Sequence, residues 1–297
     1  MRFPSVIGVL SPTQMGDCIC SLPAARYIKK IFPNSYSVAV LDPRSKELAP
    51  LLINHPDIDR IYINEKEEGY TEKEKQWVST FNCNLHLFGH YVPEIWTKIM
   101  SPREANFRLR FQFQPINSPF QGNGWNYLTE EEKIPKLEPW FNIERCNKLI
   151  VLSPFVGYYF DNEIVQTRSP SLEWWKLVVE MLLKMGFCVA QIGIKNFPLI
   201  YDHHNFYDKR NLSLLESIKL ALGADLFIGA CGGMSFIINA YGQKSICPYT
   251  DWIKDATPEA LLPVNSKNKL VPLFSKDNIN NISLEDVEKS ITKLLDS

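Results

Sequence analysis

The sequence lacks an excess of charge of either sign. Lys and Arg together number 32 and Asp and Glu 33, which leaves a formal net charge of −1 at pH 7. Proteins that bind duplex nucleic acid usually present a basic surface that neutralises phosphates. We therefore expect no nucleic-acid partner, and any anion that binds must be held by local groups rather than by the field of the whole protein.

A long uninterrupted apolar run is also missing. A membrane-spanning helix needs about 20 predominantly apolar residues, and no segment approaches that length. The apolar run at residues 6–10 is soon followed by Pro12, Gly16 and Asp17, which is too early for a signal peptide. We expect a cytoplasmic protein whose contact with a membrane, if it has one, is peripheral and at the inner face.

Recognisable metal and redox motifs are absent as well. The seven cysteines show no repeated spacing, and Cys18 and Cys20 form C-x-C rather than C-x-x-C, so we expect reduced, mostly buried thiols. His203 and His204 are adjacent, and adjacent side chains on an extended segment point to opposite sides. We expect no metal site.

The composition is that of an ordinary globular protein, and it contains enough apolar residues to form a full core. Of the 297 residues, 45% are hydrophobic and 22% are charged. Short apolar runs predict strands at 6–10, 37–41, 58–63, 85–88, 149–152, 187–192, 226–228 and 245–247. Amphipathic segments with capping residues predict helices at 16–31, 47–52, 169–186, 214–222, 234–241 and 283–294. This alternation predicts an α/β fold with parallel sheets.

The alternation is interrupted at residues 107–141, which are rich in Pro, Asn, Gln and aromatic residues. We therefore expect two Rossmann-like domains, at 1–145 and 146–275, and a C-terminal helix within 276–297. Parallel sheets bind ligands at the carboxyl ends of their strands, so two such halves predict a site in a central cleft.

Two candidate sites precede predicted helices. Asp17 follows Gly16 at the end of the first strand, where it is either a helix N-cap or a carboxylate available as a general base. Thr167 and Arg168 precede a helix predicted to have Ser169 as its N-cap. A hydroxyl, a guanidinium and a helix N-terminus together suit a diphosphate, and the alternative is a capped surface helix with a solvated arginine.

A third candidate lies between the strand at 226–228 and the next helix. Gly232 and Gly233, followed by Met234 and Ser235, expose backbone N–H groups at the positive end of a helix dipole. The pattern is not G-x-G-x-x-G, so no dinucleotide fingerprint is present, and a tight turn is the alternative. His90, after the fourth strand, either lines the cleft or is structural.

In this order, the motifs resemble those of the heptosyltransferase-like glycosyltransferases, glycosyltransferase family 9, which have the GT-B fold. The resemblance covers most of the chain except roughly residues 65 to 145. In the first half, the resemblance is carried by a Gly-Asp turn with a Leu-Pro-Ala element at 16–25 and by the sequence His-Pro-Asp-Ile-Asp at 55–59. In the second half, it is carried by a basic residue before a tryptophan-bearing helix at 168–175, by a Ser-Leu-x-Glu helix start at 212–216 and by a strand, a glycine turn and a helix at 225–235.

The resemblance implies a role for each candidate. Asp17 would deprotonate the acceptor hydroxyl, with Gly16 and His90 on the acceptor side. Thr167 and Arg168 would hold the donor diphosphate, Glu216 would lie near the ribose, and the backbone from Gly232 to Ser235, which includes Gly233 and Met234, would bind phosphate. It further implies an inverting, metal-independent transfer without a cofactor, from a nucleotide-diphosphate sugar to a glycan or glycolipid such as a lipopolysaccharide.

This chain departs from the pattern at two positions. The family usually has an acidic residue and, further along, a histidine where this chain has Cys231 and Phe236. A catalytically degenerate nucleotide-sugar binder therefore remains an alternative. A sugar-nucleotide epimerase, which also uses paired Rossmann-like halves, is a second one.

Overall fold

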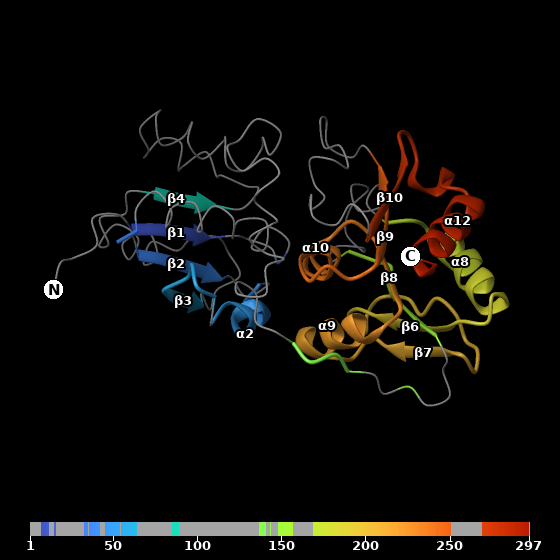
Figure 1. Ribbon diagram of the computed structural model, residues 1–297, viewed down its shortest axis with the longest axis horizontal. Helices are drawn as coiled ribbons and strands as arrows, with labels where there is room; N and C mark the ends of the chain where they lie inside the picture. The colour runs from blue at the N-terminus through green and yellow to red at the C-terminus, as the bar shows by residue number, and fades with distance from the viewer. Residues whose placement is uncertain are drawn as a thin grey trace. The chain divides into compact units, whose positions relative to one another are not determined.

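A computed structural model of the chain divides it into two compact units, Met1–Lys136 and Leu137–Ser297, and we describe each by itself. The structure describes residues 7–11, 15, 33–34, 36–41, 45–53, 55–63, 85–88, 137–140, 143, 148–156, 169–250 and 269–296 (Figure 1).

The first unit contains a four-stranded parallel sheet in the order β3-β2-β1-β4. Its strands are β1 (Ile7–Ser11), β2 (Tyr36–Leu41), β3 (Arg60–Ile63) and β4 (Leu85–Phe88). A short 3-10 helix, η1 (Lys46–Leu48), continues into α2 (Ala49–Leu52) between β2 and β3. The expected helix at 47–52 and the four expected strands are therefore confirmed, with small shifts at their ends.

The turn before β3 explains why that strand begins at Arg60 rather than Ile58. The N–H of Ile58 donates to the carbonyl oxygen of His55 at 3.1 Å, which closes a turn. Asp59 then accepts a hydrogen bond from the N–H of Ser37 at 2.6 Å through Oδ2. Ile58 thus belongs to the turn, and Asp59 attaches the turn to β2.

The second unit contains a six-stranded, entirely parallel sheet in the order β10-β9-β8-β5-β6-β7. Its strands are β5 (Leu149–Ser153), β6 (Cys188–Ile192), β7 (Phe206–Lys209), β8 (Leu226–Gly229), β9 (Ser245–Thr250) and β10 (Leu270–Ser275). Numbered from the first strand of the unit, this is the doubly wound order 3-2-1-4-5-6. The strand order reverses between β5 and β8, and a ligand is expected there, beyond the carboxyl ends of these strands.

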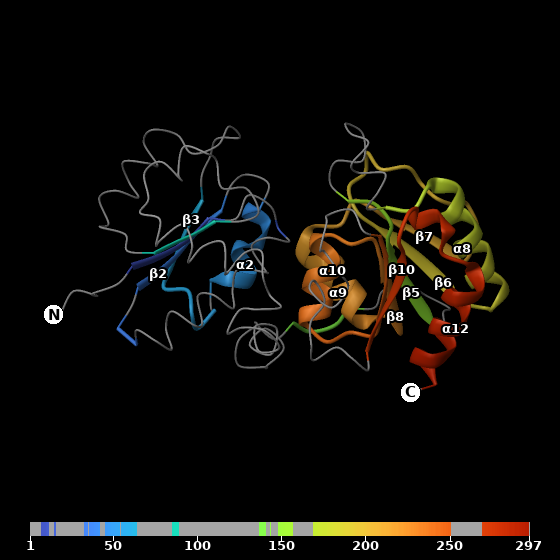
Figure 2. The same ribbon diagram turned by 90° about the horizontal axis from the view of Figure 1, so that it is seen from above.

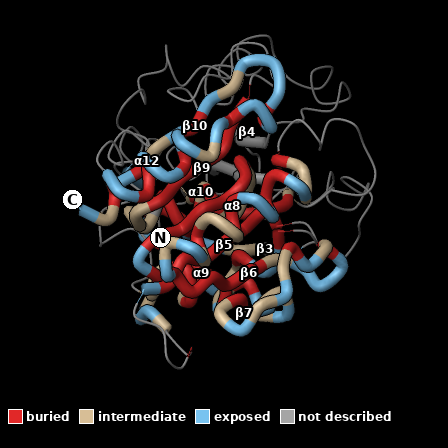
Figure 3. Tube along the Cα trace, turned by 90° about the vertical axis from the view of Figure 1, so that its right-hand side faces the viewer, coloured by how far each residue is buried: buried red, intermediate tan, exposed pale blue. Residues whose placement is uncertain are grey.

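Helices cover both faces of this sheet (Figures 1 and 2). The helices α8 (Leu172–Lys184) and α12 (Leu284–Leu295) lie on one face, and α9 (Leu214–Gly223) and α10 (Gly233–Ala240) on the other. Every residue of β5, β6, β8 and β9 is consequently buried (Figure 3). The expected α/β class with Rossmann-like parallel sheets is confirmed. Within the described ranges, no helix has the length and apolar character needed to cross a bilayer.

The N-terminus of α8 corrects one expectation from the sequence. The N-cap is Ser171, not Ser169, and its side chain accepts a hydrogen bond from the N–H of Trp174 at 3.2 Å. Ser171 is also held outside the helix because its own N–H donates to Asn280 Oδ1 at 2.7 Å. The hydroxyl of Ser169 is used elsewhere, as an acceptor for the N–H of Val156.

The sequence pattern did not predict two strands of the second unit, β7 and β10. The edge strand β7 has only one buried residue, Phe206, so it shows neither a continuous apolar run nor a clean alternation. The other edge strand, β10, contains Pro272, which cannot donate to a sheet and is tolerated at an edge.

The described cysteines only partly match the expectation. Cys231 and Cys247 are buried thiols, as expected. Cys188, the first residue of β6, is disulfide-bonded. The expectation of reduced thiols is therefore wrong for Cys188.

Candidate functional site

Of the three candidate segments, the structure describes the one between β8 and α10, which lies where the strand order of the six-stranded sheet reverses. Glu216 and the residues from Gly232 to Ser235 are described. The other candidates lie outside the described residues, and their roles stay predictions; they are Gly16, Asp17, His90, Thr167 and Arg168.

The segments that follow β5 and β8 lie next to each other, because these two strands are neighbours in the sheet. Ser153 and Gly229 are paired in the sheet, and the N–H of Ala230 donates to the carbonyl oxygen of Ser153 at 3.0 Å. Beyond this pair, an ideal β-carbon on Gly232 would lie 2.6 Å from Cγ1 of Val156. The segment after β5 therefore lies directly against the first residue before α10.

The N-terminus of α10 differs from those of its neighbours in having no side-chain cap. Its N-cap is Gly232, in extended conformation with φ −161° and ψ −173°, and no side chain of the described residues caps this end. The first backbone N–H groups of a helix have no partner inside it. Serine side chains cap α8, α9 and α12. Within the described part of the chain, the N–H groups of Gly233 and Met234 have no acceptor, so they can bind an anion at the positive end of the helix dipole.

The hydroxyl of Ser235 does not take part in this opening. Its Oγ atom is buried and donates to the carbonyl oxygen of Ala230 at 2.7 Å, which ties the first turn of α10 to the end of β8. A side chain at Gly229 would collide with this arrangement, because its β-carbon would lie 2.7 Å from Ser235 Oγ. The contribution of Ser235 to an anion site is therefore its backbone N–H.

The residues behind the helix start form an apolar cluster. Cys231, Cys247, Tyr249 and Leu270 are buried together, and Phe236 packs against them. The hydrogen bond with Cys231, together with burial, raises the pKa of the Cys247 thiol well above its ordinary value. Neither of the two residues that depart from the family pattern thus contributes a charged side chain at this helix start.

Glu216 lies at the start of α9, where it forms a capping box. Its Oε2 atom accepts hydrogen bonds from the N–H of Ser213 at 2.9 Å and from the Ser213 hydroxyl at 2.6 Å. The N–H of Glu216 donates in return to Ser213 Oγ at 3.3 Å. These bonds lower the pKa of Glu216. The other carboxylate oxygen, Oε1, takes no part in the capping box.

Val156 is a site residue that the sequence analysis missed. Its N–H donates to the hydroxyl of Ser169 at 3.3 Å, and its side chain contacts Gly232. Ser169 directly follows Arg168 in the sequence. The signal in the sequence was its position after the carboxyl end of a central strand, where ligand contacts are expected.

The arrangement can bind an anion through backbone N–H groups at a partly exposed helix start. Across the described residues, no group of three or more His, Cys, Asp or Glu side chains could hold a metal ion.

The fold is shared over the whole chain with solved glycosyltransferases. A glycosyl transferase of family 9 from Veillonella parvula aligns with a TM-score of 0.66 at 15% identity, over 100% of this chain and 99% of its own. The ADP-heptose LPS heptosyltransferase II of E. coli aligns with a TM-score of 0.63 at 12% identity, over 98% of both chains. E. coli heptosyltransferase WaaC with ADP-2-deoxy-2-fluoro heptose gives 0.53 at 11%, over 96% of this chain and 99% of its own.

This chain has the GT-B fold of these glycosyltransferases. No protein-family model matches the sequence, and the comparison with curated proteins finds no significant match. At 11–15% identity the likeness establishes the fold, and the chemistry has to be argued from the residues.

Proposed function

We propose that this protein is a glycosyltransferase that moves a sugar from a nucleotide-diphosphate sugar to a hydroxyl group of a glycan or glycolipid. The observation that carries the proposal is the uncapped N-terminus of α10 where the strand order of the six-stranded sheet reverses. Doubly wound sheets bind nucleotides at this place, and helix N-termini bind phosphate groups. The shared fold with heptosyltransferases supports the same reading.

In this proposal the donor diphosphate lies against the N–H groups of Gly233 and Met234. Thr167 and Arg168 immediately precede Ser169, whose hydroxyl binds the N–H of Val156 beside Gly232. That attachment supports a role for their hydroxyl and guanidinium groups at the same diphosphate.

Asp17 is proposed as the general base that removes the proton from the acceptor hydroxyl, with Gly16 and His90 on the acceptor side. The oxygen then attacks the anomeric carbon of the donor with inversion, and the nucleoside diphosphate leaves. Negative charge gathers on the leaving diphosphate in the transition state. Backbone N–H groups and Arg168 would stabilise that charge in place of a metal ion.

Binding is tested first, with a thermal-shift screen of ADP, UDP, GDP and their sugar derivatives. A ligand present at 100 times its Kd should stabilise the folded state by about 2.7 kcal/mol. No stabilisation by any nucleoside diphosphate or nucleotide sugar would contradict the proposal at its first step.

Transfer is tested with the nucleotide sugar that binds best and a panel of glycan and glycolipid acceptors. Asp17→Asn should reduce turnover by about 100-fold or more while donor affinity changes little. Asp277→Asn is the matched control because Asp277 is an exposed carboxylate in the loop after β10, and it should leave turnover unchanged. Product analysis without an acceptor separates transfer from epimerisation.

A non-catalytic nucleotide-sugar binder is the second candidate. It is favoured by the apolar cluster that contains Cys231 and Phe236, where the resemblance leads us to expect an acid and an imidazole. Such a protein would pass the thermal-shift screen, but no acceptor would give turnover that depends on Asp17.

A further inference from the structure

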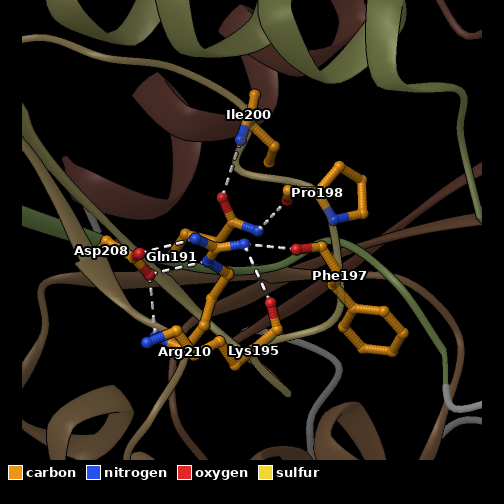
Figure 4. Close-up of polar contacts among 7 residues, drawn as sticks. All are labelled: Gln191, Lys195, Phe197, Pro198, Ile200, Asp208 and Arg210. Carbon is orange, nitrogen blue, oxygen red and sulfur yellow. Dashed lines mark hydrogen bonds and ion pairs between the residues drawn. The ribbon is translucent and has the colours of Figure 1, made fainter.

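A partly buried arginine, Arg210, holds the loop that follows β6. Arg210 donates from Nε to Oδ1 of Asp208 at 2.7 Å and from Nη2 to Oδ2 at 2.6 Å (Figure 4). Its Nη1 group donates to the carbonyl oxygen of Lys195 at 3.3 Å and also to that of Phe197. The side chain of Arg210 is only 11% exposed, so most of its donors are used inside the protein.

Gln191 holds the same loop from the strand side. Its Nε2 atom donates to the carbonyl oxygen of Pro198 at 2.8 Å, and its Oε1 atom accepts from the N–H of Ile200 at 3.0 Å (Figure 4). Two side chains, those of Arg210 and Gln191, therefore bind four backbone groups of the loop at 193–200.

The ion pair within this clamp is only partly shielded from water, since the side chain of Asp208 is 40% exposed. A partly exposed ion pair of this kind contributes little to stability, because water screens its charges. Its two parallel hydrogen bonds instead fix the geometry of the chain that carries them, because a guanidinium and a carboxylate fit together in a defined arrangement. Any segment that packs against the loop at 193–200 depends on the conformation of that loop.

The loop contacts the candidate site through two phenylalanine rings. The ring of Phe197 packs edge-on against that of Phe155, with centroids 5.6 Å apart and an interplanar angle of 60°. The next residue, Val156, lies against Gly232 and donates its N–H to Ser169 Oγ. A continuous series of contacts thus connects Arg210 with the segment beside α10.

We propose that Arg210 and Asp208 are positioning residues for the donor site, because their clamp places Phe197 and, through Phe155, the segment that includes Val156. The proposal rests on the proposed function for its effect on donor binding. Its effect on the segment after β5 can be measured without any ligand. A displacement of this segment changes the donor site because reactive geometry is sensitive to shifts of about 1 Å.

The variant that tests the clamp is Arg210→Met, which keeps an unbranched side chain and removes the four hydrogen bonds. Lys289→Met is the matched control, since it breaks an exposed ion pair with Glu285 on α12 (2.6 Å). Asp208→Asn is a second variant that keeps an acceptor and removes the charge. It answers the same question if Arg210→Met does not fold.

The first measurement is amide hydrogen exchange of the ligand-free protein. Arg210→Met should speed exchange at Val156 by about 3- to 30-fold, the size expected for coupling through packed contacts. Peptides from α12 should not change, and Lys289→Met should leave Val156 unaffected. Unchanged exchange at Val156 in both clamp variants overturns the proposal, whatever the nucleotide experiments show.

The second measurement is the Kd of the nucleoside diphosphate that stabilises the wild type most. Arg210→Met should weaken binding by about 3- to 30-fold, and adding Phe155→Leu should cause little further loss if both act on one segment. Fully additive losses, or an unchanged Kd beside altered exchange, overturn the role at the donor site. If the wild-type protein binds no nucleotide, both the role at the donor site and the proposed function are overturned. The hydrogen-exchange result still decides whether the clamp positions the segment that includes Val156.

Discussion

Val156 occupies the space into which a side chain at position 232 would extend. A β-carbon on Gly232 would lie 2.6 Å from Cγ1 of Val156, and such a contact is too short to exist without movement. Glycine is needed here for close approach and not for a left-handed backbone, because φ of Gly232 is −161°. The two residues therefore have to be considered as a pair.

Gly232→Ala is expected to lower the free energy of unfolding by about 1–3 kcal/mol, the usual cost of overpacking a well-filled site. Urea denaturation measures this change. The same substitution should weaken nucleotide binding, because the segment after β5 must move away from α10.

The control for this prediction is Gly232→Ala combined with Val156→Ala. Removing Cγ1 relieves the collision, so the double variant should recover most of the loss caused by Gly232→Ala. Losses that simply add would show that the collision is not the cause.

The capping box at α9 allows the structural role of Glu216 to be separated from its proposed contact with ribose. Ser213→Ala removes the hydroxyl that accepts from the N–H of Glu216, and it should lower the free energy of unfolding by about 1 kcal/mol. Because the carboxylate remains, nucleotide affinity should change little.

Glu216→Gln is the complementary variant, since glutamine still serves in a capping box. If the carboxylate binds ribose, this variant weakens the binding of nucleoside diphosphates but leaves that of inorganic pyrophosphate unchanged, as isothermal titration calorimetry would show. Equal losses for both ligands would rule out a contact that is specific to ribose.

The sequence was sufficient for the elements with simple patterns. The strand at β5 is a continuous apolar run, and Ser283, whose hydroxyl accepts from the N–H of Asp286, marks the start of α12 as its N-cap. Serine at both 169 and 171 left the start of α8 ambiguous, and only the tertiary contact of Ser171 with Asn280 decides between them.

The candidate site was predictable only where local sequence determines local geometry. Gly232 and Gly233 predicted an open helix start, which the structure has. The contact of Val156 with Gly232, and the ring pair of Phe155 and Phe197, join segments far apart in the chain. Such contacts follow from strand order, which short sequence patterns do not encode.

The ion pair of Asp208 and Arg210 should make stability depend on acid pH. Hydrogen bonds from Arg210 lower the pKa of Asp208 below its ordinary value. Between that lowered pKa and the ordinary value near 4, the unfolded state binds more protons than the folded state. The stabilisation is therefore full above about pH 4 to 5 and is lost as the pH falls toward the lowered value.

Asp208→Asn tests this dependence by urea denaturation between pH 7 and pH 2.5. The side chain of Asp208 is 40% exposed and thus screened by water, so the wild type should exceed the variant by no more than about 1 kcal/mol at pH 7. This difference should shrink below pH 4. A difference that stays constant down to pH 2.5 would show that the ion pair does not titrate as expected.

Trp174 and Trp175 offer a matched pair for measuring one buried hydrogen bond. The Nε1–H group of Trp174 donates to the carbonyl oxygen of Ile282 at 2.9 Å and so attaches α8 to the segment before α12. The Nε1–H group of Trp175 is buried and has no acceptor among the described residues. Both indoles are at least 95% buried, with exposed fractions of 5% and 0%.

Replacing either residue with phenylalanine removes a similar volume, but only Trp174→Phe leaves the carbonyl group of Ile282 buried without its donor. Trp174→Phe should therefore lower the free energy of unfolding by about 1–3 kcal/mol more than the cost of lost packing alone. Trp175→Phe should lower the free energy of unfolding through lost packing alone. Part of that loss should be regained, because the substitution also removes a buried donor that has no acceptor among the described residues. Urea denaturation of the two variants gives the comparison, and a larger loss for Trp175→Phe would mean that packing around Trp175 outweighs the hydrogen bond of Trp174.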